Sequence, residues 1–100
     1  SFNVHTINMQ IEFDPNKNAR NIRERGLDFT LVATFDFDNA VYKVDDRREY
    51  GEIRYIAIGY LNGRLHFLCF VATHNGLRVI SFRKANDREA KKYGKTLTID

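Results

Sequence analysis

Three runs of branched and aromatic residues in the second half of the chain form its clearest hydrophobic pattern. They cover residues 52–61, 64–73 and 77–84, and each has the length and composition of a β-strand. The dipeptides Asn62-Gly63 and Asn75-Gly76 separate them. Because Asn-Gly favours the positive φ angles of a two-residue hairpin turn, the pattern predicts a meander of three antiparallel strands.

Two tight turns would also fix which residues face each other across the meander. Leu61 would lie opposite Arg64 and Leu68 opposite Arg83, and successive side chains would point to opposite faces of the sheet. One face is more apolar and is expected to be covered by helices. It carries Ile56, Ile58, Phe67, Cys69, Val71, Ile80 and Phe82.

The other face is predicted to be open. It carries Tyr55, Ala57, Gly59, His66, Leu68, Phe70, Val79, Ser81 and Arg83. The small residues on this face would leave room for a ligand. Arg54 and Arg78 would lie on the apolar face, so the predicted register separates them from Arg83 unless a bulge intervenes.

The first half of the chain predicts two strands and two helices. Residues 9–13 and 40–44 have strand-like patterns. Asp14-Pro15 is typical of a helix start, because Asp caps the first turn and Pro fits the first helical position, and Gly26 suits the end of that helix. Asp28 can cap a second short helix.

The C-terminal part predicts one more helix. Asn86 and Glu89 have the spacing of a capping box, and Gly94 suits the helix end. The charged run at residues 45–49 is interpreted as an exposed loop.

These elements predict one α+β domain over residues 9–95. Its antiparallel sheet is expected to carry the N-terminal helices on one face and a short C-terminal helix. Residues 1–8 are interpreted as an N-terminal extension or a cloning remnant, and residues 96–100 as a loose tail.

Composition and charge narrow the class of protein. The 43% hydrophobic content and 13 aromatic residues indicate a folded domain, and no apolar run is long enough to span a membrane. The first residues lack a signal-peptide pattern, so a cytoplasmic protein is expected.

The charge is distributed unevenly along the chain. Residues 1–50 carry seven basic and nine acidic side chains, a formal charge of −2. Residues 51–100 carry nine basic and four acidic side chains, a formal charge of +5. The second half therefore favours a polyanionic partner.

Several kinds of site are absent from the sequence. One cysteine, Cys69, excludes an internal disulfide, and its apolar surroundings indicate a buried thiol. The three histidines lack the spacing of metal ligands, and no glycine-rich phosphate loop is present. We therefore expect neither a metal nor a cofactor.

The remaining candidates are cations in and beside the meander. Metal-free RNA cleavage needs a proton acceptor for the 2′-hydroxyl and charge stabilisation at the phosphate, and guanidinium groups suit the second task. Each candidate also has a structural interpretation. Glu52 and Arg54 can form a simple ion pair, Arg78 can be an ordinary edge charge, and His66 can be a satisfied surface histidine.

Three ordered segments then identify a resemblance. They are IEFDPNKN at residues 11–18, continuing to residue 29, YGEIRYIAIG at residues 50–59, and RVISFRKA at residues 78–85, followed by Glu89 and Tyr93. In these segments the chain resembles the BrnT family of type II toxin–antitoxin toxins. The resemblance implies a RelE-like ribonuclease that arrests translation. It also implies a BrnA-like antitoxin partner in a hetero-tetramer, which would contact operator DNA through the antitoxin.

The resemblance also suggests which residues act. Its recurrent polar positions correspond to Glu52, Arg54, Arg78 and Arg83, which we interpret as catalytic. Lys84 and Tyr93 also match family positions and are interpreted as RNA-binding. His66 is not among the matching positions, but it would border the hollow on the predicted open face and is also interpreted as RNA-binding. Either Glu52 or His66 is expected to be the proton acceptor.

Two other functions fit the same residues. A basic module could bind nucleic acid without cleaving it, which the charge of the second half favours. Alternatively, the cations could grip an acidic segment of a protein partner.

Overall fold

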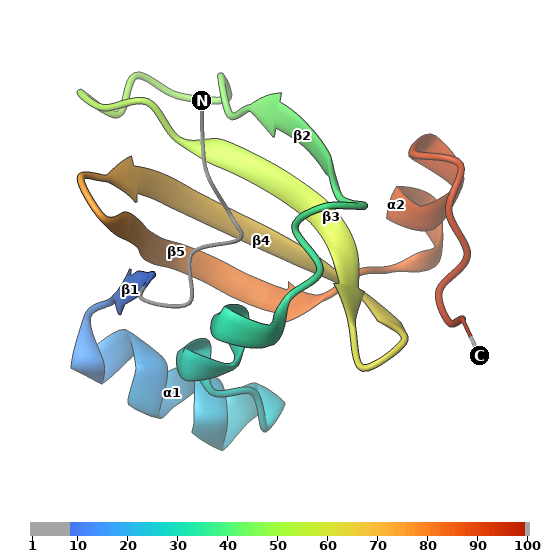
Figure 1. Ribbon diagram of the computed structural model, residues 1–100, viewed down its shortest axis with the longest axis horizontal. Helices are drawn as coiled ribbons and strands as arrows, with labels where there is room; N and C mark the ends of the chain where they lie inside the picture. The colour runs from blue at the N-terminus through green and yellow to red at the C-terminus, as the bar shows by residue number, and fades with distance from the viewer. Residues whose placement is uncertain (1–8, 100) are drawn as a thin grey trace.

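A computed structural model describes residues 9–99 (Figure 1). The fold within these residues is α+β. Its elements are β1 (Gln10–Glu12), α1 (Pro15–Arg25), the 3-10 helix η1 (Phe29–Thr34), β2 (Val41–Val44), β3 (Tyr55–Leu61), β4 (Arg64–Thr73), β5 (Gly76–Lys84) and α2 (Asp87–Lys92). None of the helices in this range is long and apolar enough to cross a membrane.

The strands form one sheet in the order β1-β5-β4-β3-β2. The pairs β2–β3, β3–β4 and β4–β5 are antiparallel, whereas β1 is parallel to β5. The sheet is therefore mixed, and the prediction of an antiparallel sheet is wrong at β1. This strand pairs with residues more than 60 positions later, a contact that local patterns do not indicate.

The capping residues predicted from the sequence define both α-helices. The Asp14 side chain accepts a hydrogen bond from the Asn16 amide, and Gly26 ends α1 at a positive φ of 64°. Asn86 and Glu89 form a capping box at α2, in which each side chain bonds to the other residue's backbone. These helix predictions are confirmed, because both rest on hydrogen bonds between near neighbours.

The two hairpins use different turns. Asn62 and Gly63 have the predicted positive φ angles of 49° and 72°. In the second hairpin Thr73 pairs with Gly76, so the turn residues are His74 and Asn75. Gly76 has another role, because a Cβ there would overlap the carbonyl oxygen of Gln10 in β1.

A bulge in β5 changes the predicted faces. Val79 pairs with Phe70, but Ser81 pairs with Cys69, which leaves Ile80 as an extra residue. Beyond this point Arg83 pairs with Phe67 rather than Leu68. Since one extra residue reverses the alternation, Arg83 lies on the same face as Arg78.

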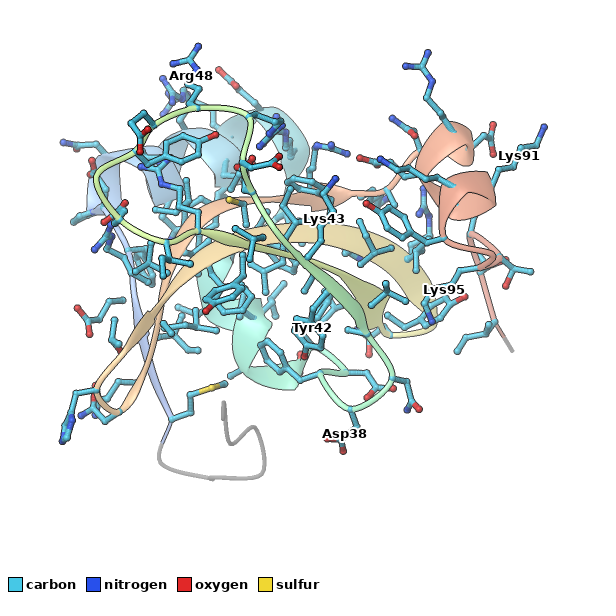
Figure 2. The ribbon with its side chains drawn as sticks, turned by 90° about the horizontal axis from the view of Figure 1, so that it is seen from above. Asp38, Tyr42, Lys43, Arg48, Lys91 and Lys95 are labelled. Atoms are coloured by element: carbon cyan, nitrogen blue, oxygen red, sulfur yellow. The ribbon has the colours of Figure 1, made fainter. Side chains whose placement is uncertain are left out.

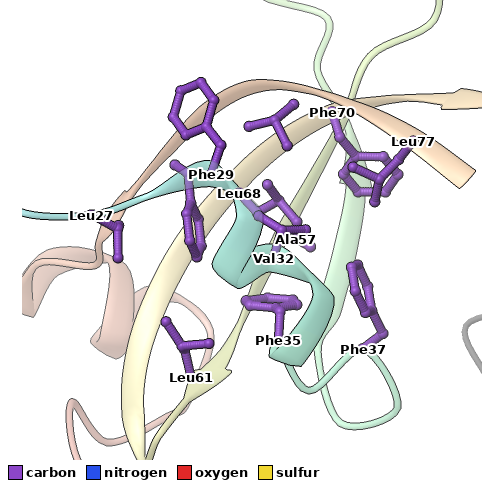
Figure 3. Close-up of a cluster of buried hydrophobic side chains, with 12 residues drawn as sticks. Leu27, Phe29, Val32, Phe35, Phe37, Ala57, Leu61, Leu68, Phe70 and Leu77 are labelled. Atoms are coloured by element: carbon purple, nitrogen blue, oxygen red, sulfur yellow. The ribbon is translucent and has the colours of Figure 1, made fainter. Parts of the chain in front are cut away.

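The larger hydrophobic core lies under η1, on the face that the sequence predicts to be open (Figure 3). That prediction is wrong because the small residues make room for η1 and the segment after it, not for a ligand. A Cβ at Gly59 would lie 2.7 Å from the Phe35 ring. The buried members of this core are Leu27, Phe29, Val32, Phe35, Phe37, Ala57, Leu61, Leu68, Phe70, Leu77, Val79 and Phe82.

The opposite face of the sheet carries α2 at one end and the loop between β2 and β3 at the other. Figure 2 shows the loop with Arg48 and helix α2 on one side of the sheet, and η1 on the other. Under α2, Ala90 and Tyr93 pack with Ile58 and Phe67. Residues 97–99 also return to the sheet, where the Leu97 carbonyl accepts a hydrogen bond from the Leu65 amide. Residues 1–8 lie outside the described range.

Candidate functional site

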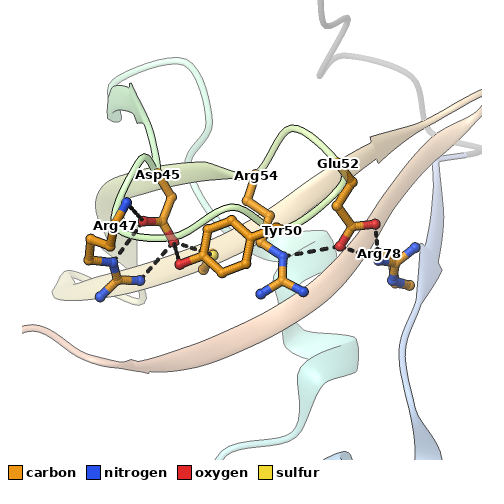
Figure 4. Close-up of polar contacts among 7 residues, drawn as sticks. Asp45, Arg47, Tyr50, Glu52, Arg54 and Arg78 are labelled. Carbon is orange, nitrogen blue, oxygen red and sulfur yellow. Dashed lines mark hydrogen bonds and ion pairs between the residues drawn. The ribbon is translucent and has the colours of Figure 1, made fainter.

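Glu52 lies between two guanidinium groups on the face opposite η1 (Figure 4). Arg54 Nε donates to Glu52 Oε2 at 3.1 Å. Arg78 Nη2 lies 2.8 Å from Oε1 and 2.9 Å from Oε2 of the same carboxylate. We call Glu52, Arg54 and Arg78 the arginine cluster; it holds two positive charges and one negative charge.

The two arginines control the ionisation of Glu52. Hydrogen bonds from Arg78 first, and from Arg54 second, lower the pKa of its carboxyl, so Glu52 is ionised at neutral pH. The side chains are partly exposed, with Arg78 at 40%. An anionic ligand from solvent can therefore reach the cluster.

The loop before β3 holds Arg54 in place. The Arg54 guanidinium stacks on the Tyr50 ring, 4.1 Å from its centroid. Tyr50 in turn donates its hydroxyl hydrogen to Asp45 Oδ2 at 3.0 Å, and the Asp45 amide donates to the Arg54 carbonyl at 2.7 Å. Figure 4 shows this row of contacts from Asp45 to Arg78.

Asp45 anchors that loop to the sheet. It is only 4% exposed, so the prediction of an exposed run at residues 45–49 is wrong at this position. Arg47 donates to both carboxylate oxygens, at 2.7 and 2.8 Å, and these bonds hold the pKa of Asp45 well below its usual range. Cys69 lies beneath, its Sγ 3.8 Å from Asp45 Oδ2. Burial and the Asp45 charge raise the pKa of the Cys69 thiol to about 11, which keeps it protonated.

Sequence reasoning missed Asp45, Arg47 and Tyr50. The available signal was weak, because a mixed run of acidic and basic residues is typical of a solvated loop. Asp45 is buried because two side chains from its own loop complete its hydrogen bonds, as a buried carboxylate requires.

A second ion pair lies near α2. Arg83 Nη1 and Nη2 contact the two carboxylate oxygens of Glu89 at 2.9 and 2.7 Å, and the guanidinium lies 4.2 Å from the centroid of the Phe67 ring. Hydrogen bonds from Arg83 lower the pKa of Glu89. The same carboxylate caps α2 at Asn86, so Arg83 is linked to the start of that helix.

The structure thus places all three predicted arginines on one face, but in two groups. Arg78 is opposite Val71 and Arg83 is opposite Phe67, four residues apart along β4. That separation corresponds to about 13 Å of strand. Cys69 and Ser81 lie between the two groups.

The structure does not bring His66 to this face. The residue is 3% exposed, its ring lies 5.3 Å from the Phe82 ring, and Nδ1 is 2.7 Å from the Arg64 carbonyl oxygen. Burial lowers the pKa of His66, so the ring is neutral at physiological pH. The prediction that His66 contacts RNA therefore needs correction: the side chain belongs to the core under η1.

Lys84 and Tyr93 lie near Arg83. Lys84 is exposed at the end of β5, and strand alternation directs it away from the face that carries Arg83. Tyr93 packs against the smaller core beneath α2, with Lys92 Nζ 5.5 Å from its ring centroid. Within residues 9–99, no group of three His, Cys, Asp or Glu side chains is placed to hold a metal ion.

A protein-family model matches most of this chain. The model described as "Ribonuclease toxin, BrnT, of type II toxin-antitoxin system" matches residues 13–89. The matched range contains the arginine cluster, the Asp45 loop and the pair of Arg83 with Glu89. No curated protein matched the chain.

Proposed function

Because the chain belongs to the BrnT family of ribonuclease toxins of type II toxin–antitoxin systems, we propose that it cleaves RNA at the arginine cluster, without a metal ion, and thereby arrests translation. The observation that carries this proposal is Glu52 held between Arg54 and Arg78 on an accessible face. A RelE-like fold and a cytoplasmic site of action belong to the same proposal.

The two arginines supply the charge for phosphate binding. Their single carboxylate partner leaves the cluster with one net positive charge, and guanidinium groups bind phosphate oxygens through paired N–H donors. A phosphate between Arg54 and Arg78 would compete with Glu52 for these donors. The same donors would then stabilise the negative charge that develops on the phosphate during cleavage.

Glu52 is the proposed proton acceptor. As long as both arginines bond to it, its lowered pKa makes it a weak base. When phosphate takes their hydrogen bonds, the pKa of Glu52 rises toward the usual value, and the carboxylate accepts a proton from the 2′-hydroxyl more readily. RNA binding would therefore activate the base. The 2′-oxygen would then bond to phosphorus as the P–O5′ bond breaks, and the leaving 5′-oxygen would take a proton from water.

Arg83 is proposed to bind a neighbouring phosphate. Its distance from Arg78 along the sheet favours a separate contact over a shared one. Tyr93, which packs beneath α2 near Arg83, is proposed to position the RNA beyond that contact. Lys84 points to the opposite face, so it is proposed to contact the RNA only where the strand passes the end of β5.

Membership of a type II system implies an antitoxin protein as partner. We propose that the antitoxin is BrnA-like, that toxin and antitoxin form a hetero-tetramer, and that operator DNA contacts the toxin only through the antitoxin.

The direct test is incubation of the purified protein with a defined RNA in the presence of a chelator such as EDTA. The expected result is cleavage that does not require added Mg²⁺, together with growth arrest when the toxin is expressed without antitoxin. Retention of intact RNA, with salt-dependent binding and no growth arrest, would instead favour the non-catalytic nucleic-acid-binding module. Formation of a protein complex with no RNA affinity would favour the interaction domain.

A further inference from the structure

A cavity of about 350 Å³ lies between α1 and the exposed edge of β5, next to the proposed site. Figure 1 shows α1 running beside this strand. Beyond Arg78, β5 has no neighbouring strand on this side within residues 9–99, because β1 pairs only with residues 76–78. We call this cavity the α1 groove; it is lined by Lys17, Arg20, Asn21, Glu24, Arg25, Phe29, Ile80 and Ser81.

The groove is predominantly basic. Three cations of α1 and one carboxylate, Glu24, lie along it. Lys17 and Arg20 form no ion pair with any residue of the described chain. Arg25 is held by a 2.8 Å hydrogen bond to Asn21 Oδ1, and the buried Asn21 amide donates to the carbonyl oxygens of Leu27 and Phe82. Asn21 thus fixes both the helix and one groove cation against β5.

The groove also connects with the face that carries the arginines. Ser81 lines the groove, and the bulge at Ile80 places Ser81 in register with Cys69, between Arg78 and Arg83. A chain bound at the arginine cluster can therefore continue past Ser81 into the groove.

Two features argue against strand addition by a protein at this edge. A bulge interrupts the regular pairing of β5. In addition, the Phe82 carbonyl oxygen already accepts a hydrogen bond from the Asn21 side chain, so it is less available to an added strand. Both features protect sheet edges from pairing with another chain. A ligand would therefore bind in the groove mainly through its charge, not through backbone hydrogen bonds to β5.

We infer that the α1 groove binds the sugar–phosphate backbone of single-stranded RNA beside the cleaved phosphate, an inference that rests on the proposed function. Lys17 and Arg20 contact phosphate oxygens, and Arg25 adds a third positive charge. The cleaved RNA therefore needs nucleotides beyond those at the arginine cluster for full affinity.

The test compares two variants that each remove two positive charges. Lys17→Gln/Arg20→Gln changes the groove, whereas Arg23→Gln/Lys91→Gln changes two exposed cations that do not line it. Binding of a fully 2′-O-methylated RNA, which cannot be cleaved, is measured by fluorescence anisotropy over a series of salt concentrations. The groove variant is expected to lower the steepness of log K against log salt by about 1.4, because each lost phosphate contact on a single strand removes about 0.7.

The control variant is expected to keep the wild-type slope. Equal slopes for both double variants would overturn the inference, and so would an unmodified protein that fails to bind the RNA. Wild-type RNA binding by the groove variant with loss of the antitoxin complex would assign the groove to the protein partner instead. If the slope changes as expected but the unmodified protein cleaves no RNA, the groove assignment stands and the proposed function fails.

Discussion

Arg78→Ala is expected to lower the rate of RNA cleavage by about 10²–10³, the usual effect of removing one well-placed electrostatic donor. Arg78 contacts both oxygens of Glu52 and is the more exposed arginine of the cluster, so it is well placed to bind a phosphate. The rate is measured in single-turnover reactions with excess protein over a defined RNA. The cleavage rate of Arg78→Lys should lie between those of the wild type and of Arg78→Ala, because lysine keeps the positive charge but lacks the paired N–H donors.

Arg48→Ala provides the matched control. Arg48 is exposed on the loop before β3, which also carries Glu52 and Arg54 (Figure 2), and it forms no ion pair or hydrogen bond within the described chain. Thermal unfolding of both variants should resemble that of the wild type, since an exposed ion pair contributes at most about 1 kcal/mol. Wild-type cleavage by Arg78→Ala would remove this residue from the proposed site.

Phe82→Ala is expected to lower the free energy of unfolding by about 3–5 kcal/mol. The Phe82 side chain is fully buried, with the rings of Phe35 and His66 packed edge-on and tilted against it at centroid distances of 6.3 and 5.3 Å. The loss is a large part of the roughly 5–15 kcal/mol that stabilises a domain of this size. Urea unfolding of the wild type and the variant at the same pH measures this change in the free energy of unfolding.

Ile53→Ala is the comparison for that variant. Ile53 is 63% exposed, so its truncation should change the free energy of unfolding by no more than about 0.5 kcal/mol. A loss below about 1 kcal/mol for Phe82→Ala would show that Phe82 does not lie in the core under η1, and would contradict the bulge that places it there.

The sequence was sufficient to predict both α-helices and the first hairpin turn. Asp14-Pro15, Gly26 and the pair of Asn86 with Glu89 act through bonds between near neighbours, and Asn62-Gly63 sets its own backbone angles. Such local interactions leave a direct pattern in the chain.

The faces of the sheet depend on contacts that have no local pattern. Nothing in the run around Ile80 indicates a bulge, yet this one extra residue moves Arg83 to the face that carries Arg78. Gly76 has the pattern of a turn residue because it follows asparagine. The structure instead requires glycine there because the Gln10 backbone lies too close to leave room for a Cβ. Small residues at Ala57 and Gly59 suggested a ligand hollow, which Phe35 and its neighbours fill.

The residues of the candidate site could be predicted from the sequence, but the neighbouring residues that hold them in place could not. Glu52, Arg54 and Arg78 were proposed from alternation and resemblance, and the structure brings these three together. The supporting contacts run through Asp45 and Tyr50, whose roles depend on a loop that folds back over Cys69. A charged loop sequence alone does not distinguish that arrangement from a solvated one.

If a phosphate of bound RNA displaces Glu52 from Arg54 and Arg78, the chemical environment of both guanidinium groups must change. The most direct measurement is a titration of ¹⁵N-labelled protein with fully 2′-O-methylated RNA, followed through the arginine Nε–H resonances. The resonances of Arg54 and Arg78 are predicted to shift together and saturate, while that of Arg48 stays in place. Unchanged Arg54 and Arg78 resonances at saturating RNA would contradict the assignment of the arginine cluster as the RNA-cleaving site.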